Sequence, residues 1–286
     1  MQDFSGGQKI TIQVKFLQSN LLLIGSGKWP NKINSIIRSQ NSKTLIKNVG
    51  AREFLKLKIE QIDQILKDKI VWIASTPENQ LFILDKIKSF NNKVVLEKPV
   101  AVTSNQLNQL HHLNKNGNNK FYVSEPWRHS EIWLKAKSRL LTATGQKRLK
   151  IYRGGPIKRD YVDPPWDWMQ HDLGLLGELL FIQKESLKIN CELSKNKDNL
   201  IIYIQAFESY EIEINLGLFP QRKELWMLNN QAFIDFANRD TFGDHPVNSM
   251  FEYICSEDFS SDFENQVWLT KQILTKLEEA TPQSSI

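Results

Sequence analysis

Short apolar runs alternate with longer amphipathic stretches in the first part of the chain. The run at residues 21–24 is wholly apolar and ends in glycine, which is typical of a strand buried on both faces of a parallel sheet. Beyond it, Ile33, Ile36 and Ile37 have the spacing of one helical face. Continued along the chain, the pattern predicts strands at 44–46, 70–74, 94–96 and 121–123 and helices at 31–39, 59–66, 81–90 and 106–114. Such alternation predicts a doubly wound, parallel Rossmann sheet.

The pattern changes after residue 124. Consecutive strand-like segments with short turns predict a largely antiparallel sheet, at 148–152, 187–193, 200–207, 212–218, 224–228 and 232–236. Helices are expected at 133–141 and 169–181, around Met250 and at 263–279. The predicted fold class is therefore α/β, with a dinucleotide-binding Rossmann domain over residues 1–124. An α+β domain over 125–286 follows, and its last helix can pack back on the first domain. An alternating segment at 9–16 is expected to add an edge strand.

The composition narrows the class of protein. A chain of 286 residues with 41% hydrophobic content can bury a sizeable core. No stretch approaches the ~20 apolar residues of a membrane span, and no signal peptide is recognisable, so we expect a cytoplasmic protein without a membrane partner. The lysines behind the net charge of +5 are spread evenly, which predicts no nucleic-acid partner but suits an anionic small ligand. The two cysteines and five histidines have no metal-binding spacing, so no metal is expected.

A glycine turn follows the first predicted strand. Gly25 and Gly27 lie between that strand and a helix, which is the context of a dinucleotide-binding fingerprint. The first glycine would make the tight turn, and the second would let the backbone approach a pyrophosphate at the helix N-terminus. Pro30 stands where the third glycine is expected, and we expect it to be the first residue of the helix.

The adenosine side of the expected cofactor site departs from the pattern of NAD-binding proteins. These proteins place an acid about 20 residues after the glycine turn, on the ribose hydroxyls. Here the region contains Lys47, Asn48 and Arg52, and the segment 46–52 has no acid. The two cations would meet a 2′-phosphate, which favours NADP, and Asn48 would bind a ribose hydroxyl. The other interpretation is that the adenosine half is degraded and cofactor binding is weak or lost.

Four segments together resemble the Gfo/Idh/MocA family of oxidoreductases, which includes glucose–fructose oxidoreductase and inositol dehydrogenase. Ile-Gly-Ser-Gly-Lys-Trp-Pro-Asn at 24–31 resembles the family's glycine turn, and Ala-Ser-Thr-Pro at 74–77 resembles its turn beside the nicotinamide. Leu-Glu-Lys-Pro-Val-Ala at 96–101 matches its Glu-Lys-Pro strand end, the most specific of the four. Trp-Asp-Trp-Met-Gln-His-Asp at 166–172 is similar to a segment of members that act on sugar nucleotides.

The resemblance implies an NAD- or NADP-dependent oxidoreductase of a sugar or nucleotide sugar, with Lys98, Asp167 and His171 as catalytic residues. It places the cofactor against Gly25, Ser26, Gly27, Lys28, Trp29, Asn48, Ser75, Thr76, Pro77, Asn79, Glu97 and Lys98. Arg128, Arg153 and Trp168 are candidate substrate contacts. The basic loop at 154–159 suits either a phosphate-bearing substrate or a solvated surface. Members of the family commonly dimerise through the second-domain sheet, so the resemblance also implies a homo-oligomer.

The chemistry of these side chains fits hydride transfer. While a hydride leaves the carbon of a secondary alcohol, a base takes the hydroxyl proton, and histidine titrates near neutral pH. Asp167, four residues before His171 on the same helical face, is expected to orient the imidazole. A lysine ammonium can stabilise negative charge on the oxygen. Glu97 is either a cofactor contact or a structural group that pairs with a neighbouring N–H.

The departures from the family pattern favour a second interpretation. A non-catalytic descendant would keep the two domains as a binding or scaffold protein and lose cofactor affinity. Family members often carry an acid three residues after the histidine, where this chain has Gly174. The missing third glycine and the missing ribose-binding acid also favour the non-catalytic descendant. The retained Lys98, Asp167 and His171 favour the enzyme.

Overall fold

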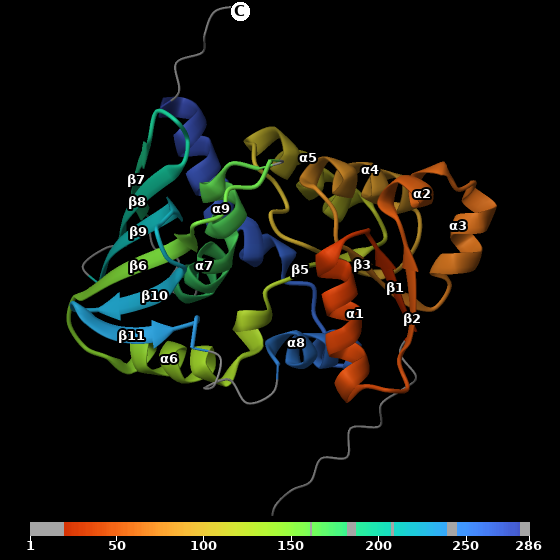
Figure 1. Cartoon of the computed structure of the whole chain (residues 1–286), viewed down its shortest axis with the longest axis horizontal. Helices are drawn as coiled ribbons and strands as arrows, with labels where there is room; N and C mark the ends of the chain where they lie inside the picture. The colour runs from red at the N-terminus through yellow and green to blue at the C-terminus, as the bar shows by residue number, and fades with distance from the viewer. Residues whose placement is uncertain (1–19, 161, 182–186, 207–208, 239–244, 281–286) are drawn as a thin grey trace, which may run out of the picture.

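The computed structural model describes residues 20–160, 162–181, 187–206, 209–238 and 245–280. The chain forms two halves, each built around one β-sheet (Figure 1). The first half has a five-stranded parallel sheet in the order β2-β1-β3-β4-β5. Its strands are β1 (Asn20–Ile24), β2 (Leu45–Val49), β3 (Lys69–Ile73), β4 (Lys93–Leu96) and β5 (Lys120–Val123).

Helices cover both faces of this sheet, because its central strands are apolar on both sides. On one face, α1 (Lys28–Gln40) and α8 (Pro246–Cys255) pack over Leu21, Leu23 and Trp72. The other face carries α2 (Ala51–Lys56), α3 (Ile59–Leu66), α4 (Pro77–Ile87) and α5 (Ser104–Asn116). Because α8 comes from the C-terminal part of the chain, the first sheet is buried only when the whole chain has folded.

The second half contains a six-stranded mixed sheet in the order β11-β10-β6-β9-β8-β7. Within this sheet, β6 and β9 are the only described neighbours that pair in parallel, and the other neighbouring strands are antiparallel. The strands are β6 (Lys147–Gly155), β7 (Leu187–Leu193), β8 (Asn199–Ala206), β9 (Tyr210–Leu218), β10 (Lys223–Leu228) and β11 (Gln231–Asp235). One face packs on α6 (Glu131–Thr142), α7 (Pro164–Phe181) and α9 (Phe263–Ala280), and the short helix η1 (Pro126–His129) precedes α6.

Two buried glutamines join the halves. Gln170 on α7 accepts a hydrogen bond from the Val100 N–H at 2.8 Å and donates one to the Ala101 carbonyl at 2.9 Å. Gln266 on α9 makes the same pair of bonds with the backbone of Val123, at 2.8 and 3.0 Å. Because a buried amide is costly to leave unpaired, these contacts fix the ends of β4 and β5 against the second half.

The structure confirms the predicted fold class and corrects several element boundaries. Helix α1 begins at Lys28, so Pro30 is its third residue and not its first, still within the turn whose N–H groups lack helical partners. Helix α4 starts at Pro77 instead of residue 81, and β2 continues to Val49. Helix α2 was not predicted, because six residues are too few to show a helical period. The strand predicted at 9–16 lies outside the described residues.

Within those residues, no helix combines the length and the apolar character needed to cross a membrane. The same part of the chain has no group of three or more acids, histidines or cysteines placed to hold a metal ion.

Candidate active site

The carboxyl ends of the five parallel strands lie in one row. Backbone N–H groups just beyond β1, β3, β4 and β5 donate to carbonyls at the ends of neighbouring strands, in the pairs Gly25–Val49, Ala74–Ile24, Glu97–Ile73 and Ser124–Leu96. The residues that follow these strands therefore share one edge. In an open parallel sheet this is the edge where ligands bind.

The glycine turn has backbone angles that glycine adopts readily and other residues rarely do. The φ angles are +157° at Gly25 and +132° at Gly27. A Cβ on Gly25 would overlap the carbonyl oxygen of Ala74, whereas the space in front of Gly27 is open. Ser26, Gly27 and Lys28 are exposed, and α1 begins at Lys28 without an acid in its first turn. These residues fit a pyrophosphate held at the N-terminus of α1.

The end of β2 presents the residues expected at the adenosine side. Lys47 and Asn48 are exposed and point to opposite faces of this strand. Arg52 is exposed in the first turn of α2, where Glu53 follows it. An acid thus lies one residue beyond the segment in which the sequence shows none.

The turn between β3 and α4 is tied to the end of β4. Ser75, Thr76 and Asn79 are half-buried there, and Pro77 begins α4. The side chain of Gln80 donates hydrogen bonds to the Ser75 carbonyl at 2.9 Å and to the Glu97 carbonyl at 2.7 Å. The residues expected beside the nicotinamide are therefore fixed directly to the strand end that carries Lys98.

Glu97 lies beneath the crevice. It is 4% exposed, and its carboxylate accepts a hydrogen bond from the indole N–H of Trp72 at 2.8 Å. Burial raises the pKa of Glu97, although the neighbouring Lys98 charge and the Trp72 N–H act in the opposite direction. This placement supports the structural interpretation of Glu97 and does not support a direct cofactor contact.

Lys98 projects from the end of β4 toward α7. Its ammonium lies 3.4 Å from the backbone carbonyl oxygen of Asp167, and the Lys98–Pro99 peptide bond is cis. Burial lowers the pKa of Lys98, while the negative charges of Asp167 and Glu97 raise it. The structure thus brings Lys98, from the first half, to the helix that carries Asp167 and His171.

Asp167 and His171 share α7, but their side chains do not pair. The Asp167 carboxylate binds Nε of Arg159 at 3.0 Å. Nδ1 of His171 is buried without a hydrogen-bond partner in the described part of the chain. The prediction that Asp167 orients the imidazole is therefore wrong, because Arg159, on the loop before α7, engages that carboxylate.

The electrostatic surroundings of His171 keep its ring neutral. Burial lowers its pKa well below the usual value, and the nearby positive charges lower it further, those of Lys98, Arg153, Arg222 and Arg159. The neutral ring is the form that can accept a proton.

Arg128 was predicted to contact substrate, and the structure places it in a buried ion network. Its side chain is 8% exposed. The guanidinium lies 2.8 Å from Asp262, 3.5 Å from Glu125 and 3.6 Å from Glu178. These acids hold the charge between η1, α7 and α9. The predicted substrate contact of Arg128 is corrected accordingly, because its guanidinium is enclosed and already paired with these acids.

Arg153 also differs from its predicted role. Its side chain is fully buried and binds Asp172 through two hydrogen bonds, at 2.8 and 2.7 Å. A third bond of 2.7 Å reaches Glu224, and the indole N–H of Trp226 donates to Asp172 at 2.7 Å. The network anchors α7 on β6 and β10 at the residue after His171. Arg153 therefore positions the helix instead of contacting substrate.

Glu125 occupies the space beside Gly174. A Cβ on Gly174 would overlap the Glu125 carboxylate, so this position accepts only glycine while Glu125 keeps its place. Burial raises the pKa of Glu125 to about 7, although Arg128 and Gln266 lower it. A carboxyl group thus lies against this turn of α7 even though the sequence has no acid there.

Glu125 should make stability depend on pH. Its folded pKa of about 7 exceeds the ordinary value of 4.5, so its stabilising effect is complete below pH 4.5 and is lost as the pH rises through 7. Compared with Glu125→Gln, the wild type should lose on the order of 2–3 kcal/mol of unfolding free energy between pH 5 and pH 8. Urea denaturation of both proteins at the two pH values measures this difference. A difference that stays constant with pH would contradict it.

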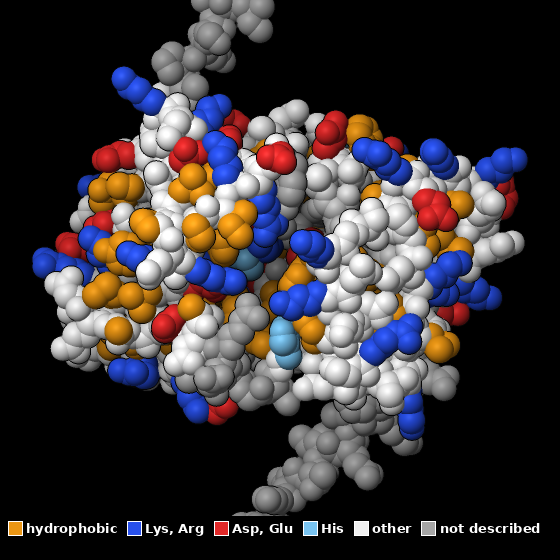
Figure 2. Space-filling view, in the orientation of Figure 1, with side chains coloured by type: hydrophobic (Ala, Val, Ile, Leu, Met, Phe, Trp, Pro, Cys, Tyr) orange, Lys and Arg blue, Asp and Glu red, His pale blue; other side chains and the backbone are white. Residues whose placement is uncertain are grey.

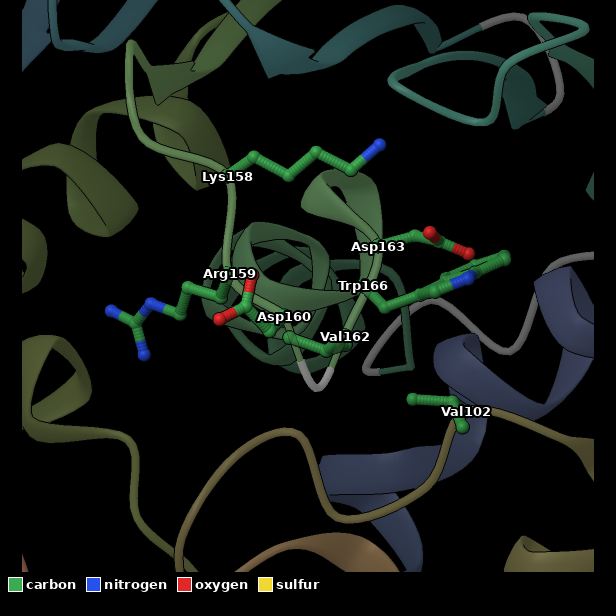
Figure 3. A pocket seen from close by; sticks show the side chains of 7 residues that line it. All are labelled: Val102, Lys158, Arg159, Asp160, Val162, Asp163 and Trp166. Carbon is green, nitrogen blue, oxygen red and sulfur yellow. The ribbon is translucent and has the colours of Figure 1, made fainter.

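A pocket opens beside this cluster, between the loop before α7 and the segment after Pro99 (Figure 3). Its volume is about 640 Å³, and it is lined by Val102, Lys158, Arg159, Asp160, Val162, Asp163 and Trp166. Arg159 extends to one side and Asp163 with Trp166 to the other. Both halves of the molecule contribute to its lining.

Several residues of the site were not predicted. Gln80 and Gln170 fix the strand ends, Glu125 packs on α7, and Arg159 binds Asp167. For two of these residues the sequence position was a signal, because Gln170 lies within the segment 166–172 and Arg159 within the loop at 154–159. Most of their partners are distant in sequence, as Glu97 is from Gln80, Val100 from Gln170 and Gly174 from Glu125, so no spacing rule identifies them.

Neither the protein-family profiles nor the curated proteins searched contain a match to this sequence. Solved structures do match over nearly the whole chain. The WlbA (WbpB) dehydrogenase of Thermus thermophilus, in complex with NAD and UDP-GlcNAcA, has a TM-score of 0.67 at 13% identity over 94% of this chain and 97% of its own. A myo-inositol dehydrogenase of Corynebacterium glutamicum also has a TM-score of 0.67, at 11% identity over 92% and 97%.

The chain has the fold of the Gfo/Idh/MocA dehydrogenases. The fold also occurs in the biliverdin reductase of Synechocystis, in complex with biliverdin and NADP+, which has a TM-score of 0.64 at 12% identity over 92% of this chain and 99% of its own. The Gfo/Idh/MocA fold therefore does not define a substrate by itself. An inference about the substrate has to rest on the side chains at the edge of the Rossmann sheet.

Proposed function

We propose that this protein is an NAD(P)-dependent oxidoreductase that transfers a hydride to or from a secondary alcohol of a sugar or nucleotide sugar. The observation that carries the proposal is the meeting of Lys98 with the helix of His171 at the edge where β1, β3 and β4 end. The NAD and UDP-GlcNAcA bound by the WlbA dehydrogenase of the same fold support it.

The first half provides a binding site that fits the cofactor. The open space in front of Gly27 and the acid-free first turn of α1 fit the pyrophosphate, and Ser75 and Thr76 would border the nicotinamide. When bound, the nicotinamide supplies or accepts the hydride. The protein's own groups control position and proton transfer.

His171 and Lys98 divide the proton and charge chemistry. The neutral imidazole accepts the hydroxyl proton as the alcohol carbon is oxidised. The Lys98 ammonium holds the substrate oxygen and stabilises the negative charge that develops on it. In the reductive direction the same groups act in reverse: His171 returns the proton to the substrate oxygen, and the Lys98 ammonium holds that oxygen.

We expect tighter binding of NADPH than of NADH, because Lys47 and Arg52 flank the adenosine side. A charge-assisted contact contributes about 1.5–3 kcal/mol, so Arg52→Met should weaken NADPH binding by about tenfold or more and leave NADH binding unchanged. Fluorescence titration of each nucleotide measures this, with Lys56→Met at the other end of α2 as the control. Equal or tighter binding of NADH would contradict the preference. Binding of neither nucleotide would favour the non-catalytic descendant.

We also propose a homo-oligomer formed through the uncovered face of the second sheet. Tyr203 is 38% exposed on this face, and Ile201 and Tyr152 are half-buried there. Light scattering should give a mass of at least about twice the chain's 33.3 kDa. Tyr203→Glu should lower the mass to that of one chain, and Phe82→Glu on α4 should not. A wild-type mass of one chain would refute the assembly.

A further inference from the structure

Two basic pairs meet at the edge of the second sheet that faces the crevice. Lys158 and Arg159 lie on the loop after β6, and Arg222 and Lys223 lie where β10 begins. The antiparallel register places Lys223 opposite Gly154 near the end of β6, so the two segments are neighbours. Lysine and arginine side chains gather around the hollow between the two halves (Figure 2).

Arg222 faces α7, and its neighbour faces away. The Arg222 guanidinium contacts the Glu224 carboxylate and lies 5.7 Å from the centre of the Trp168 ring. The ammonium of Lys223 lies instead over Tyr152 and Phe219, at 5.3 and 5.4 Å. Alternation along the strand thus directs one charge of this pair toward the active-site helix and the other away from it.

Hydrogen-bonding groups beside Arg222 lack partners. The indole N–H of Trp168 is buried and has no hydrogen-bond acceptor within the described residues. Nδ1 of His171 is also buried there without a hydrogen-bond partner. Trp168 and His171 are three residues apart on α7 and so are neighbours on its surface. Apart from the Nε contact with Glu224, no hydrogen bond of the Arg222 guanidinium is found in the described ranges. Because buried donors are normally satisfied, the Trp168 N–H points to a missing acceptor, and the Arg222 side chain beside it is 51% exposed.

His171 lies within a cluster of cations and carboxylates. Four cations act on its ring, and three carboxylates bind them: Asp167 holds Arg159, Asp172 holds Arg153, and Glu224 is shared by Arg153 and Arg222. The fourth cation, Lys98, lies over the backbone of Asp167. The buried carboxylate of Glu97 lies beside Lys98 and offsets its charge. Arg222 is a cation of this cluster that a ligand can reach, because its side chain is 51% exposed.

We propose that the substrate carries a carboxylate or phosphate group, which Arg222 binds together with the indole N–H of Trp168. This inference deepens the proposed function, since that function supplies the reacting alcohol beside His171. A planar guanidinium and an adjacent N–H form a set of donors that suits a carboxylate or phosphate oxygen. A neutral sugar offers no anionic partner to the exposed guanidinium. Arg222 is thus a specificity residue for an acidic substrate.

Calorimetric titration with glucose, glucuronate and inorganic pyrophosphate tests this on the full chain without cofactor. Wild type should bind at least one of the two anions about tenfold or more tightly than glucose, the size expected for a charge-assisted contact. Arg222→Met should abolish this ratio, and Trp168→Phe, which keeps an aromatic side chain but removes the indole N–H, should reduce it. Lys223→Met is the matched control, because it removes the same charge from the adjacent residue on the other face, and it should keep the ratio.

The pattern among the probes identifies the anion. Binding that depends on Arg222 for glucuronate indicates a carboxylate on the sugar, and binding that depends on it for pyrophosphate indicates a phosphate group. Equal affinity for glucose and both anions, or an equal loss in Lys223→Met, would overturn the proposal. Because no cofactor is present, failure here is distinct from failure of the oxidoreductase assignment, which the NADPH titration tests separately.

Discussion

Lys98→Ala and His171→Ala should each lose most of the proposed oxidoreductase turnover. Removing a general base or a charge-stabilising donor lowers the rate by about 10² to 10⁴. In the proposed reaction Lys98 and His171 act on the same oxygen and proton, so the double variant should be hardly slower than either single one. The change in absorbance of the reduced nicotinamide follows turnover with the accepted sugar or nucleotide sugar.

The control separates chemistry from folding. His112 is exposed on α5, away from the strand ends, so His112→Ala should keep full turnover. Both catalytic variants should keep the melting temperature of the wild type within a few degrees, since active-site groups are often held at some cost in stability. Turnover of Lys98→Ala close to that of the wild type would exclude Lys98 from the reaction.

Asp172→Ala should be among the most destabilising single changes in the protein. It would leave the fully buried Arg153 with only Glu224 as an acidic partner and remove the acceptor of the Trp226 N–H. Breaking one side of a buried ion pair costs about 3–5 kcal/mol, because the remaining charge stays out of water. Urea denaturation at neutral pH measures the loss of unfolding free energy.

Asp85→Ala is the matched control for this change. It removes the same side chain from an ion pair with Lys88 whose two members are 65% and 59% exposed. Such surface pairs contribute about 0–1 kcal/mol. Equal losses in the two variants would contradict the structural role assigned to the Arg153 network.

Burial and spacing alone determined most of the architecture of this protein. A wholly apolar run that ends in glycine, as at 21–24, has few solutions other than a strand buried on both faces of a parallel sheet. Local chemistry likewise placed Gly25, Gly27 and Lys98 at strand ends, because tight turns and strand ends depend on residues adjacent in the chain. These features of the fold are confirmed, and the roles at the site remain proposals.

The tertiary structure alone decided which charged groups are free to act. Arg128, Arg153 and Arg159 look alike in the sequence, yet the first two are enclosed by acids from other elements and the third engages the carboxylate that was expected to orient His171. Gly174 looks like a lost acid until Glu125 is seen to occupy its space. An ion pair or a filled space commonly depends on residues from different elements, and a spacing rule reports only on neighbours within one element. The sequence therefore determined where the strands end, and the packing of α7 and α9 determined which side chains meet there.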